Sequence, residues 1–380
     1  MRTCGIYFFV LAFFMFGCSN DRSESQELIE DFPNIDADYS LLVKNNDLLS
    51  LINLNADAET IFLDTGVNAF ESISNPLVSY RDDNEISIYS TQPDCSGRIS
   101  LYNFINDALQ KTDVFNDLGN CDLIAKALAH SGNTFCVAYE VPGTGIEESL
   151  YYVRIIDTSA LEPDFIDIEL GKRPLQAVIS NNRLFILSED IADNNKNALI
   201  VLDTWMKELV ADINLGFEVQ KLFKSDEGNL IVSYPDFHTH INGATMAITK
   251  TVRYDNGKEP RFGDSESPFY DDKGNLYYAM PTNLSGTLYP NIPAVYDFET
   301  NTAILYYYEN FLSEQEQLFE FEIGNTSMVA YDTKNDLIVI GYQKSGDPDR
   351  GGLLRIRPIP NPAFIDNIDL NGVPFQMFTK

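Results

Sequence analysis

Short apolar runs alternate with polar turns along most of the chain, and this pattern predicts β-strands. Residues 217–224 predict one strand, 225–229 a turn and 230–234 a second strand. The turn contains Asp, Gly and Asn, which tolerate the positive φ that tight hairpins require. No window of useful length has the 3.6-residue period of a helix, and β-branched and aromatic residues are frequent. We therefore expect an all-β fold.

Two markers recur about every fifty residues and indicate one structural unit used repeatedly. The first marker is a glycine, at Gly66, Gly119, Gly171, Gly216, Gly263, Gly324 and Gly372. The second marker is an asparagine in a hairpin-type turn, at Asn84, Asn133, Asn182, Asn229, Asn275 and Asn335. Third and fourth strands follow in each unit, as in residues 199–203 and 165–171. Four short strands per unit are typical of a β-propeller blade.

The number of blades follows from the glycines. Seven of them bound six complete units and leave apolar segments at both ends of the chain. These segments predict strands near residues 41–43, 48–53, 60–63 and 373–378. Together they would form a seventh blade, which removes the exposed sheet edges of an open array. A six-bladed ring is the alternative.

The turn-strand pattern Asp-x-Gly-Asn-Leu occurs at residues 226–230 and 272–276. With third strands that end near an Asp, it resembles bacterial seven-bladed propellers of the YncE and TolB-like type, and more closely the lipoprotein propellers common in Bacteroidetes. The resemblance covers residues 38–380 and implies architecture only. WD-repeat and kelch signatures are missing, and Trp205 is the single tryptophan.

The N-terminus predicts export and lipidation. An uncharged apolar run, residues 6–16, follows Arg2 and predicts a signal peptide over residues 1–17. The segment 15–18, Met-Phe-Gly-Cys, resembles the lipobox of bacterial lipoproteins, although Met15 and Phe16 depart from the usual residues. The resemblance implies lipidation of Cys18. The polar, acidic and unpatterned residues that follow predict a flexible tether over residues 18–37, and the repeat predicts a propeller domain over 38–380. Ser19 favours the outer membrane, at the cell surface or its periplasmic face.

The net charge of the chain limits the classes of partner that it can bind. Lys and Arg number 26 against 57 Asp and Glu, which gives a net charge of −31. Such a surface repels nucleic acid and anionic lipid, so we expect no nucleic-acid partner. The expected membrane contact is through the lipid anchor.

Loop lengths predict which end of the propeller binds. The loops between second and third strands lie at the same end as the blade-to-blade connections, and we expect the long ones at residues 90–98, 140–149, 189–197, 235–243, 281–292 and 343–352. Elaborated loops commonly carry binding residues. Cys95 and Cys121 both fall at this end, so we predict a disulfide between them, as an oxidising compartment permits. Cys136 lies in an apolar strand and should be a buried thiol.

The candidate binding residues lie in these loops. His238 and His240 alternate within one loop and could hold a divalent metal with an acidic third ligand; no other cofactor is predicted. His130 falls at the opposite end. Aromatic and charged neighbours complete the set: Tyr234, Asp236, Phe237, Tyr289 and Arg350. No catalytic motif such as Gly-x-Ser-x-Gly or His-Glu-x-x-His is present.

We therefore expect a non-enzymatic lipoprotein that binds a small ligand or an outer-membrane protein through its long-loop end. Bacteroidetes propellers of this kind resemble accessory proteins of TonB-dependent uptake systems. One alternative is a hydrolase or lyase that acts on a glycan or peptide, with catalytic residues converging from different blades. Another is a structural component of an envelope assembly.

Overall fold

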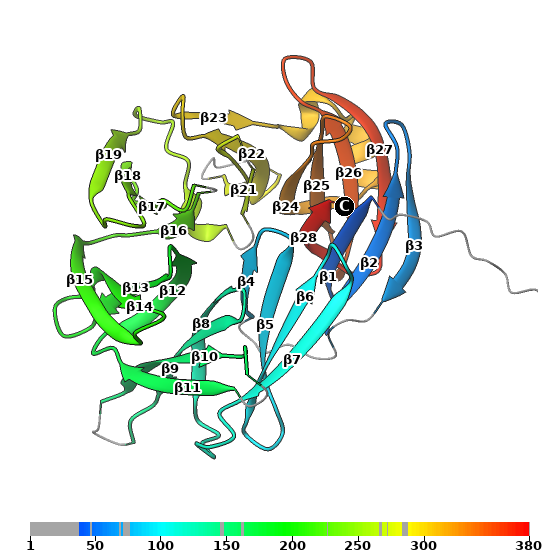
Figure 1. Cartoon of the computed structure of the whole chain (residues 1–380). Coiled ribbons are helices and arrows are strands. Elements are labelled where there is room, and N and C mark those ends of the chain that lie inside the picture. Colours follow the sequence, from blue (N-terminus) through cyan, green and yellow to red (C-terminus); the bar gives the residue numbers. More distant parts are fainter. Residues whose placement is uncertain are drawn as a thin grey trace, which may run out of the picture. The chain divides into compact units, whose positions relative to one another are not determined.

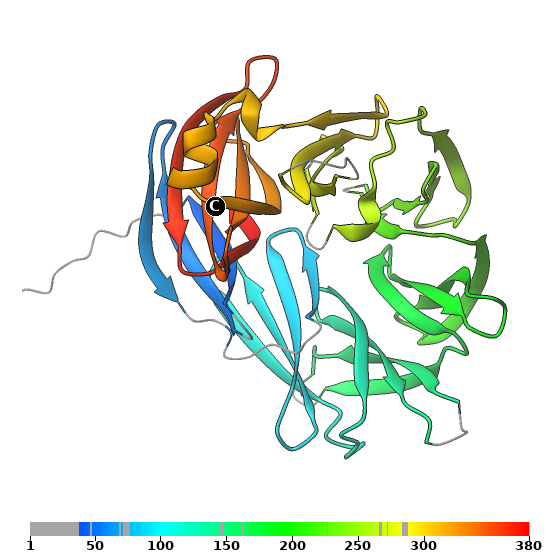
Figure 2. The ribbon, with the colours of Figure 1, turned by 180° about the vertical axis from the view of Figure 1, so that it is seen from behind.

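The computed structural model describes residues 38–45, 48–67, 70, 77–144, 148–160, 163–225, 227–265, 268–271, 273–282 and 288–379. The predicted signal peptide, the tether and Cys18 lie outside them. Ala37–Lys380 form one compact unit. Within it, seven four-stranded antiparallel sheets form a seven-bladed β-propeller (Figure 1), and Figure 2 shows the same ring from the opposite end. The all-β, seven-bladed prediction is confirmed, and the six-bladed alternative is wrong.

Each blade runs from an innermost strand at the centre of the ring to an outermost strand at its rim. In that order, blade 1 contains β28 (Val373–Thr379), β1 (Tyr39–Asn45), β2 (Leu48–Ala56) and β3 (Ile61–Val67). Blade 2 contains β4 (Val78–Asp82), β5 (Glu85–Thr91), β6 (Gly97–Asn103) and β7 (Ala108–Val114). Blade 3 contains β8 (Ile124–Ser131), β9 (Thr134–Val141), β10 (Leu150–Asp157) and β11 (Asp164–Glu169). Blade 4 contains β12 (Arg173–Ser180), β13 (Arg183–Asp190), β14 (Lys196–Asp203) and β15 (Glu208–Gly216).

Blades 5 to 7 follow the same order. Blade 5 contains β16 (Lys221–Lys224), β17 (Leu230–Ser233), β18 (Phe237–Ile241) and β19 (Ile248–Arg253). Blade 6 contains β20 (Phe269–Tyr270), β21 (Asn275–Pro281), β22 (Asn291–Asp297) and β23 (Thr302–Leu305). Blade 7 contains β24 (Ile323–Asp332), β25 (Leu337–Lys344), β26 (Asp347–Arg357) and β27 (Ala363–Leu370). Three short helical segments join blades 5, 6 and 7: η1 (Phe262–Asp264), η2 (Tyr308–Asn310) and η3 (Glu316–Glu320).

Burial explains why the inner strands are almost continuously apolar. The blades pack face to face, so both sides of a middle strand are covered; all of β17 is buried. Outermost strands such as β11 have one free edge and expose most of their residues. Five of the six asparagine markers fall in the turn between the first and second strands of their blades, and Asn275 is the first residue of the second strand, β21, of blade 6. Blade 1 lacks this turn because β28 and β1 come from opposite ends of the chain.

The two chain ends close the ring. β28 pairs antiparallel with β1 along its length. A buried polar network then ties β1 to blade 7: the Tyr39 hydroxyl donates to Asp332, and Nη1 of Arg355 donates to the Tyr39 oxygen at 3.3 Å and to the Asp57 carbonyl at 2.5 Å. The closure that the glycine count predicts is therefore reinforced by contacts between side chains.

Blades 3 and 7 contain the same buried arginine unit. Arg154 on β10 and Arg355 on β26 are almost fully buried, and each lies opposite an aspartate of the outermost strand. The guanidinium of Arg154 binds both carboxylate oxygens of Asp167, at 2.8 and 2.5 Å, and Arg355 binds Asp366 in the same way, at 2.8 and 2.7 Å. Arg154 also binds Asp117 in the connection from blade 2. Such bidentate pairs fix geometry as well as charge.

The two ends of the propeller differ in the segments that they carry. The connection end carries the blade-to-blade segments and the loops between second and third strands; the turn end carries the asparagine turns. The predicted loops at the connection end are wrong in two places, because residues 235–243 contain β18 and residues 343–352 contain much of β26. The polar residues of these segments favour a loop in the sequence, but in the structure they belong to strands that pair within a sheet. The long segments at this end are instead residues 254–265 and 306–322.

One strand is also shorter than predicted. Residues 217–224 predict a single strand, but β16 begins only at Lys221. Phe217 is exposed, and Gly216, which has a φ of +82°, ends β15 just before it. A left-handed residue at this position stops the outer strand and redirects the chain toward the centre.

Candidate functional site

The predicted binding residues of blade 5 do not form a loop site. His238 and His240 lie on β18 and face blade 6, where the His238 ring contacts Phe298 with centroids 5.1 Å apart. Tyr234 stacks on Phe237 and donates its hydroxyl proton to the Leu215 carbonyl at 3.0 Å. Asp236 is exposed in the short turn before β18. These side chains therefore face different neighbours.

The histidine pair is an aromatic packing contact. The two rings point the same way, with centroids 5.0 Å apart, as their alternation predicts. Nδ1 of His238 pairs with the Tyr254 hydroxyl at 3.2 Å, and burial lowers the pKa of His238 to about 3. The Nε2 atoms of both histidines have no hydrogen-bond partner among the described residues. Within those residues no group of three or more His, Cys, Asp or Glu is arranged to hold a metal, so the divalent metal stays a prediction without a third ligand.

The two other predicted residues lie elsewhere in the ring. Tyr289 is buried and donates to Gln317 Oε1 at 2.9 Å, where it helps to pack η3 against blade 6. Arg350 is exposed on β26 rather than in a loop. Neither lies with the histidine pair, and the predicted set does not converge.

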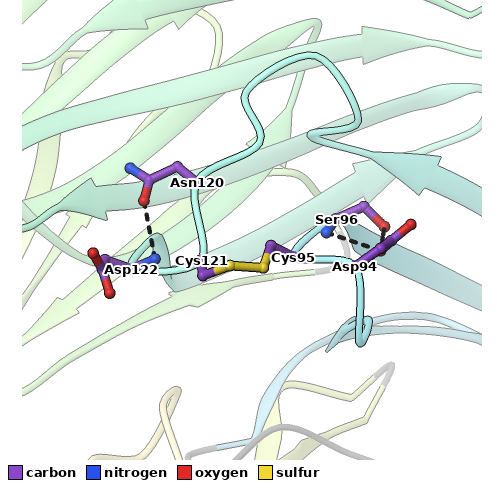
Figure 3. Close-up of a disulfide and its surroundings, with 6 residues drawn as sticks. All are labelled: Asp94, Cys95, Ser96, Asn120, Cys121 and Asp122. Atoms are coloured by element: carbon purple, nitrogen blue, oxygen red, sulfur yellow. Dashed lines mark hydrogen bonds between the residues drawn. A yellow bond between two sulfur atoms is a disulfide. The ribbon is translucent and has the colours of Figure 1, made fainter.

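At the connection end of blades 2 and 3, Cys95 and Cys121 form a disulfide with Cα atoms 4.6 Å apart (Figure 3). This is the pairing that the sequence predicts, and Cys136 is a buried free thiol. The N–H and hydroxyl of Ser96 donate to the Asp94 carboxylate, and the Asp122 N–H donates to the side-chain oxygen of Asn120. Local hydrogen bonds therefore order the residues on either side of each cysteine. A shallow hollow of about 400 Å³ lies beside the disulfide, between Gln92 and Gly119.

A larger cavity than this hollow lies at the centre of the ring. Its volume is about 890 Å³, and it is lined by the innermost strands of six blades together with the Thr333 turn of blade 7. The β4–β5 hairpin stands near the middle of the ring in Figure 1. Charged side chains that line the cavity are Arg81, Asp82, Asp83, Lys126, Lys221, Lys224 and Asp271. A cavity of this size with convergent polar groups is the usual form of a small-ligand site.

Ion pairs and hydrogen bonds hold most of these charges in place. Lys224 of blade 5 reaches Asp82 of blade 2 and so bridges blades that are not neighbours. Lys126 is the unpaired residue of a β-bulge in β8 and binds Glu140 at 2.7 Å. Bulges re-aim side chains in this manner. Asp271 accepts the Asn275 N–H at 2.8 Å and the Tyr277 hydroxyl at 3.1 Å.

A second buried histidine lies close to this bridge. His130 of β8 is fully buried, with Nδ1 2.8 Å from the Ser87 hydroxyl and Nε2 3.5 Å from a Glu85 oxygen. Burial lowers the pKa of His130, although Asp82 and Glu85 partly oppose the shift. Its ring packs edge-on against Tyr80, which places it behind the cavity wall near the turn end, away from the histidine pair of blade 5.

The cavity residues are not among those predicted from the sequence, although a signal for them exists. The strand before each asparagine turn is the innermost one, so a charged residue within it should face the centre. Arg81, Lys126, Lys221 and Lys224 all meet that condition. Loop length favours the connection end instead, because elaborated loops are the commoner binding elements.

The described residues contain no helix long and apolar enough to cross a membrane. No protein-family model matches the chain, and no curated protein sequence does so. Among solved structures it is similar to a candidate 6-phosphogluconolactonase from Bacteroides uniformis ATCC 8492, with 10% identity, 90% of this chain and 100% of that chain covered, and a TM-score of 0.52. Another from Bacteroides fragilis NCTC 9343 has 11% identity, coverage of 91% and 99%, and a TM-score of 0.52.

TolB from Acinetobacter baumannii has 11% identity, covers 90% of this chain and 82% of its own, and has a TM-score of 0.43, which is too low to carry an argument. At these identities the likeness shows the fold alone, and function has to be argued from the site.

Proposed function

We propose that the chain is a non-enzymatic binding protein of the bacterial envelope that holds a small polar ligand in its central cavity. This proposal rests on the charged residues of that cavity. In the whole chain acidic residues outnumber basic ones by 57 to 26, whereas the cavity wall contains Arg81, Lys126, Lys221 and Lys224 beside only three aspartates. Basic groups thus gather where the innermost strands meet.

The contacts of the cavity favour binding over catalysis. A hydrolase needs an acid or base poised to exchange a proton with the substrate. Here Lys224 and Lys126 are engaged with carboxylates, and Asp271 accepts several hydrogen bonds. The described histidines are buried or half-buried, and the pKa of each is lowered by desolvation. Groups held in this way can orient a ligand without exchanging protons with it. A lyase or hydrolase role is retained as an outcome of the test.

The location is part of the same proposal. Lipidation of Cys18 would anchor the propeller at the outer membrane through the acidic tether, and an accessory role beside a TonB-dependent uptake system follows from the resemblance to Bacteroidetes lipoproteins. Metabolic labelling with a palmitate analogue tests the anchor: the label should be lost in Cys18→Ser. Equal labelling of that variant would contradict it.

Blocking the cavity tests the binding role. Leu175 lines the cavity and is partly exposed, so Leu175→Trp should fill space without breaking a core contact. Leu150→Trp, at an exposed site on β10, is the matched control. Neutral and acidic monosaccharides, amino acids and dipeptides are titrated against the full chain, with the melting temperature as readout.

A ligand of the cavity should raise the melting temperature of the wild type and of Leu150→Trp, but not of Leu175→Trp. An equal rise in all three proteins would place binding outside the cavity. Conversion of the ligand, seen by mass spectrometry, would favour the enzyme.

A second candidate function, docking in an envelope assembly, is favoured by one turn of blade 4. Trp205 is 86% and Met206 62% exposed, and the Asp203 carboxylate accepts both of their N–H groups, at 2.9 and 2.8 Å. An ordered turn that displays large apolar side chains is typical of contact sites. A photoreactive residue at position 205 should cross-link to a partner in cells, whereas one at Ile105, in the equivalent turn of blade 2, should not.

A further inference from the structure

Arg81 is the cavity residue with the most unusual surroundings. It lies on β4, and its guanidinium contacts two aromatic rings from other blades: Phe378 at 4.1 Å and Phe269 at 4.7 Å from the ring centroids. Nη1 donates to the Met377 carbonyl at 2.9 Å, and Nε lies 3.3 Å from the Asp83 carbonyl. Phe378 is itself fully buried and stacked on Phe104. The guanidinium plane is therefore held in position by blades 1, 2 and 6.

No carboxylate of the described residues forms an ion pair with Arg81. The contrast with the other deeply placed arginines is clear, since Arg154 and Arg355 each bind an aspartate through two hydrogen bonds. Arg81 has carbonyls and rings as partners, and its remaining N–H groups have none among the described residues. A guanidinium carries five N–H donors and stays charged at neutral pH.

This arrangement leaves a positive charge facing the cavity with no carboxylate bound to it, although the nearby Asp83 carboxylate attracts it. Withdrawal of a charge from water is unfavourable unless it is paired. The aromatic faces offset part of that cost, and burial lowers the pKa of Arg81 to about 10, which keeps it protonated at neutral pH. An oxyanion in the cavity would supply both a directly bound negative charge and acceptors for the unused N–H groups.

A second wall residue lacks a partner. Gln376 of β28 lines the same cavity, and its Oε1 is buried with no hydrogen-bond partner among the described residues. An amide oxygen accepts from hydroxyl and N–H groups. Gln376 precedes Met377, whose carbonyl binds Arg81, so an anion-binding group and a hydroxyl acceptor lie on adjoining parts of the wall.

We propose that Arg81 anchors the anionic group of a small hydroxylated ligand, either a carboxylate or a phosphate, in the central cavity. The inference rests on the proposed binding function and adds the chemical class of the ligand to it. Phe378 and Phe269 hold the guanidinium plane so that its free edge meets two oxygens at once, which is the bidentate geometry that arginine forms with carboxylate and phosphate. Gln376 accepts a hydroxyl from the body of the ligand.

Calorimetric titration of the full chain with galacturonate and with galactose tests the proposal, because these sugars differ mainly in one carboxylate. Inorganic phosphate and galactose 1-phosphate separate a free anion from a sugar-borne phosphate. Arg81→Met removes the charge and keeps an apolar contact with the rings. Arg350→Met, at an exposed site on β26, is the control with the same net charge. Arg81→Lys keeps the charge and serves as a second variant.

We expect at least one anion to bind the wild type and Arg350→Met, and to bind Arg81→Met about tenfold to a hundredfold more weakly, as for loss of a charged hydrogen bond. Arg81→Lys should lie between them. Failure of all the anions to bind the wild type overturns the proposal without any variant. Equal binding of galactose and galacturonate, unchanged in Arg81→Met but lost in Leu175→Trp, overturns the anion anchor and leaves the proposed binding function intact.

Discussion

At the residue scale, the same kinds of side chain take opposite roles according to their partners. Arg154 is neutralised by two aspartates and joins blades 2 and 3, whereas Arg81 faces the cavity against rings and carbonyls. The first is structural, and the second is available to a ligand. Neither role can be read from the local sequence, because the partners come from other strands and other blades.

Replacement of Arg154 should destabilise the fold. Arg154→Met leaves the carboxylates of Asp117 and Asp167 without their cation, and we expect the free energy of unfolding to fall by about 3 kcal/mol, the lower end for a broken buried pair, because both carboxylates are partly exposed. Urea denaturation measures this. Arg350→Met should change it little.

The loss of stability in Arg154→Met should also depend on pH. The hydrogen bonds from Arg154 hold the pKa of Asp117 below its usual range in the folded protein. The stability that this ion pair contributes is therefore present above the pKa that Asp117 has in the unfolded chain, and it is lost as the pH falls through its pKa in the folded protein. The gap between wild type and variant should therefore narrow in acid. A gap that stays constant down to the acid transition would contradict this account.

His238 predicts a separate acid sensitivity. Its pKa is about 3 in the folded protein against 6.5 for a free histidine, so the unfolded chain binds more protons between those values. The stability that His238 contributes is then fully present above about pH 6.5. As the pH drops below that value, the free energy of unfolding falls by up to about 1.4 kcal/mol per pH unit. His238→Phe should flatten this slope in urea denaturation at pH 7 and pH 5.

The control for His238 is a histidine with normal hydration. Phe319→His places one at a 77% exposed site on η3, where we expect no added slope between pH 7 and pH 5. If His238→Phe retained the full slope of the wild type, the burial of that imidazole could not be its source.

At the element scale, the errors of prediction fall mostly on strands that contain polar residues. The sequence of β18, Phe-His-Thr-His-Ile, favours a loop, yet His238 and Thr239 are buried. β26 begins with Asp, Pro and Asp, and its first residues favour a loop for the same reason. A neighbouring blade can bury a polar side chain on a strand and supply partners for it. Composition alone does not reveal that neighbour.

The Cys95–Cys121 element carries its own prediction. The disulfide joins residues 26 apart, so its removal in Cys95→Ser/Cys121→Ser should lower the free energy of unfolding by about 3 kcal/mol. Non-reducing mass spectrometry should find the two peptides linked, and Cys136 should resist alkylation in the folded chain because it is buried. Free alkylation of Cys95 and Cys121 would rule the pairing out, and Cys136→Ala should leave it unchanged.

At the scale of the whole molecule, a strand from the C-terminus closes the ring. β28 buries Phe375, Met377 and Phe378 and forms the innermost edge of blade 1. Without residues 372–380, β1 would become an exposed, apolar innermost edge. We expect that truncated chain to lose its cooperative thermal transition and to aggregate.

A complementation experiment distinguishes loss of the ring-closing strand from general destabilisation of the truncated chain. A peptide of residues 371–380 added in trans should restore the transition of the truncated chain, since a missing strand can be supplied by augmentation. The same peptide with Phe378→Ser should not, because Phe378 is fully buried against Phe104. A truncated chain that melts like the wild type would show that the ring does not need this strand.

The β class, the four-stranded repeat, the shared blade of the two chain ends and the pairing of Cys95 with Cys121 were all predictable from the sequence, which favoured seven blades over six. These follow from periodic turns and apolar runs, which are local and repeat in every blade. The positions and contacts of Arg81, Lys224 and the histidines became visible in the folded chain alone. The physical reason is that each of these contacts joins residues of different strands or blades, and the repeat that encodes the ring is common to all blades and does not specify them.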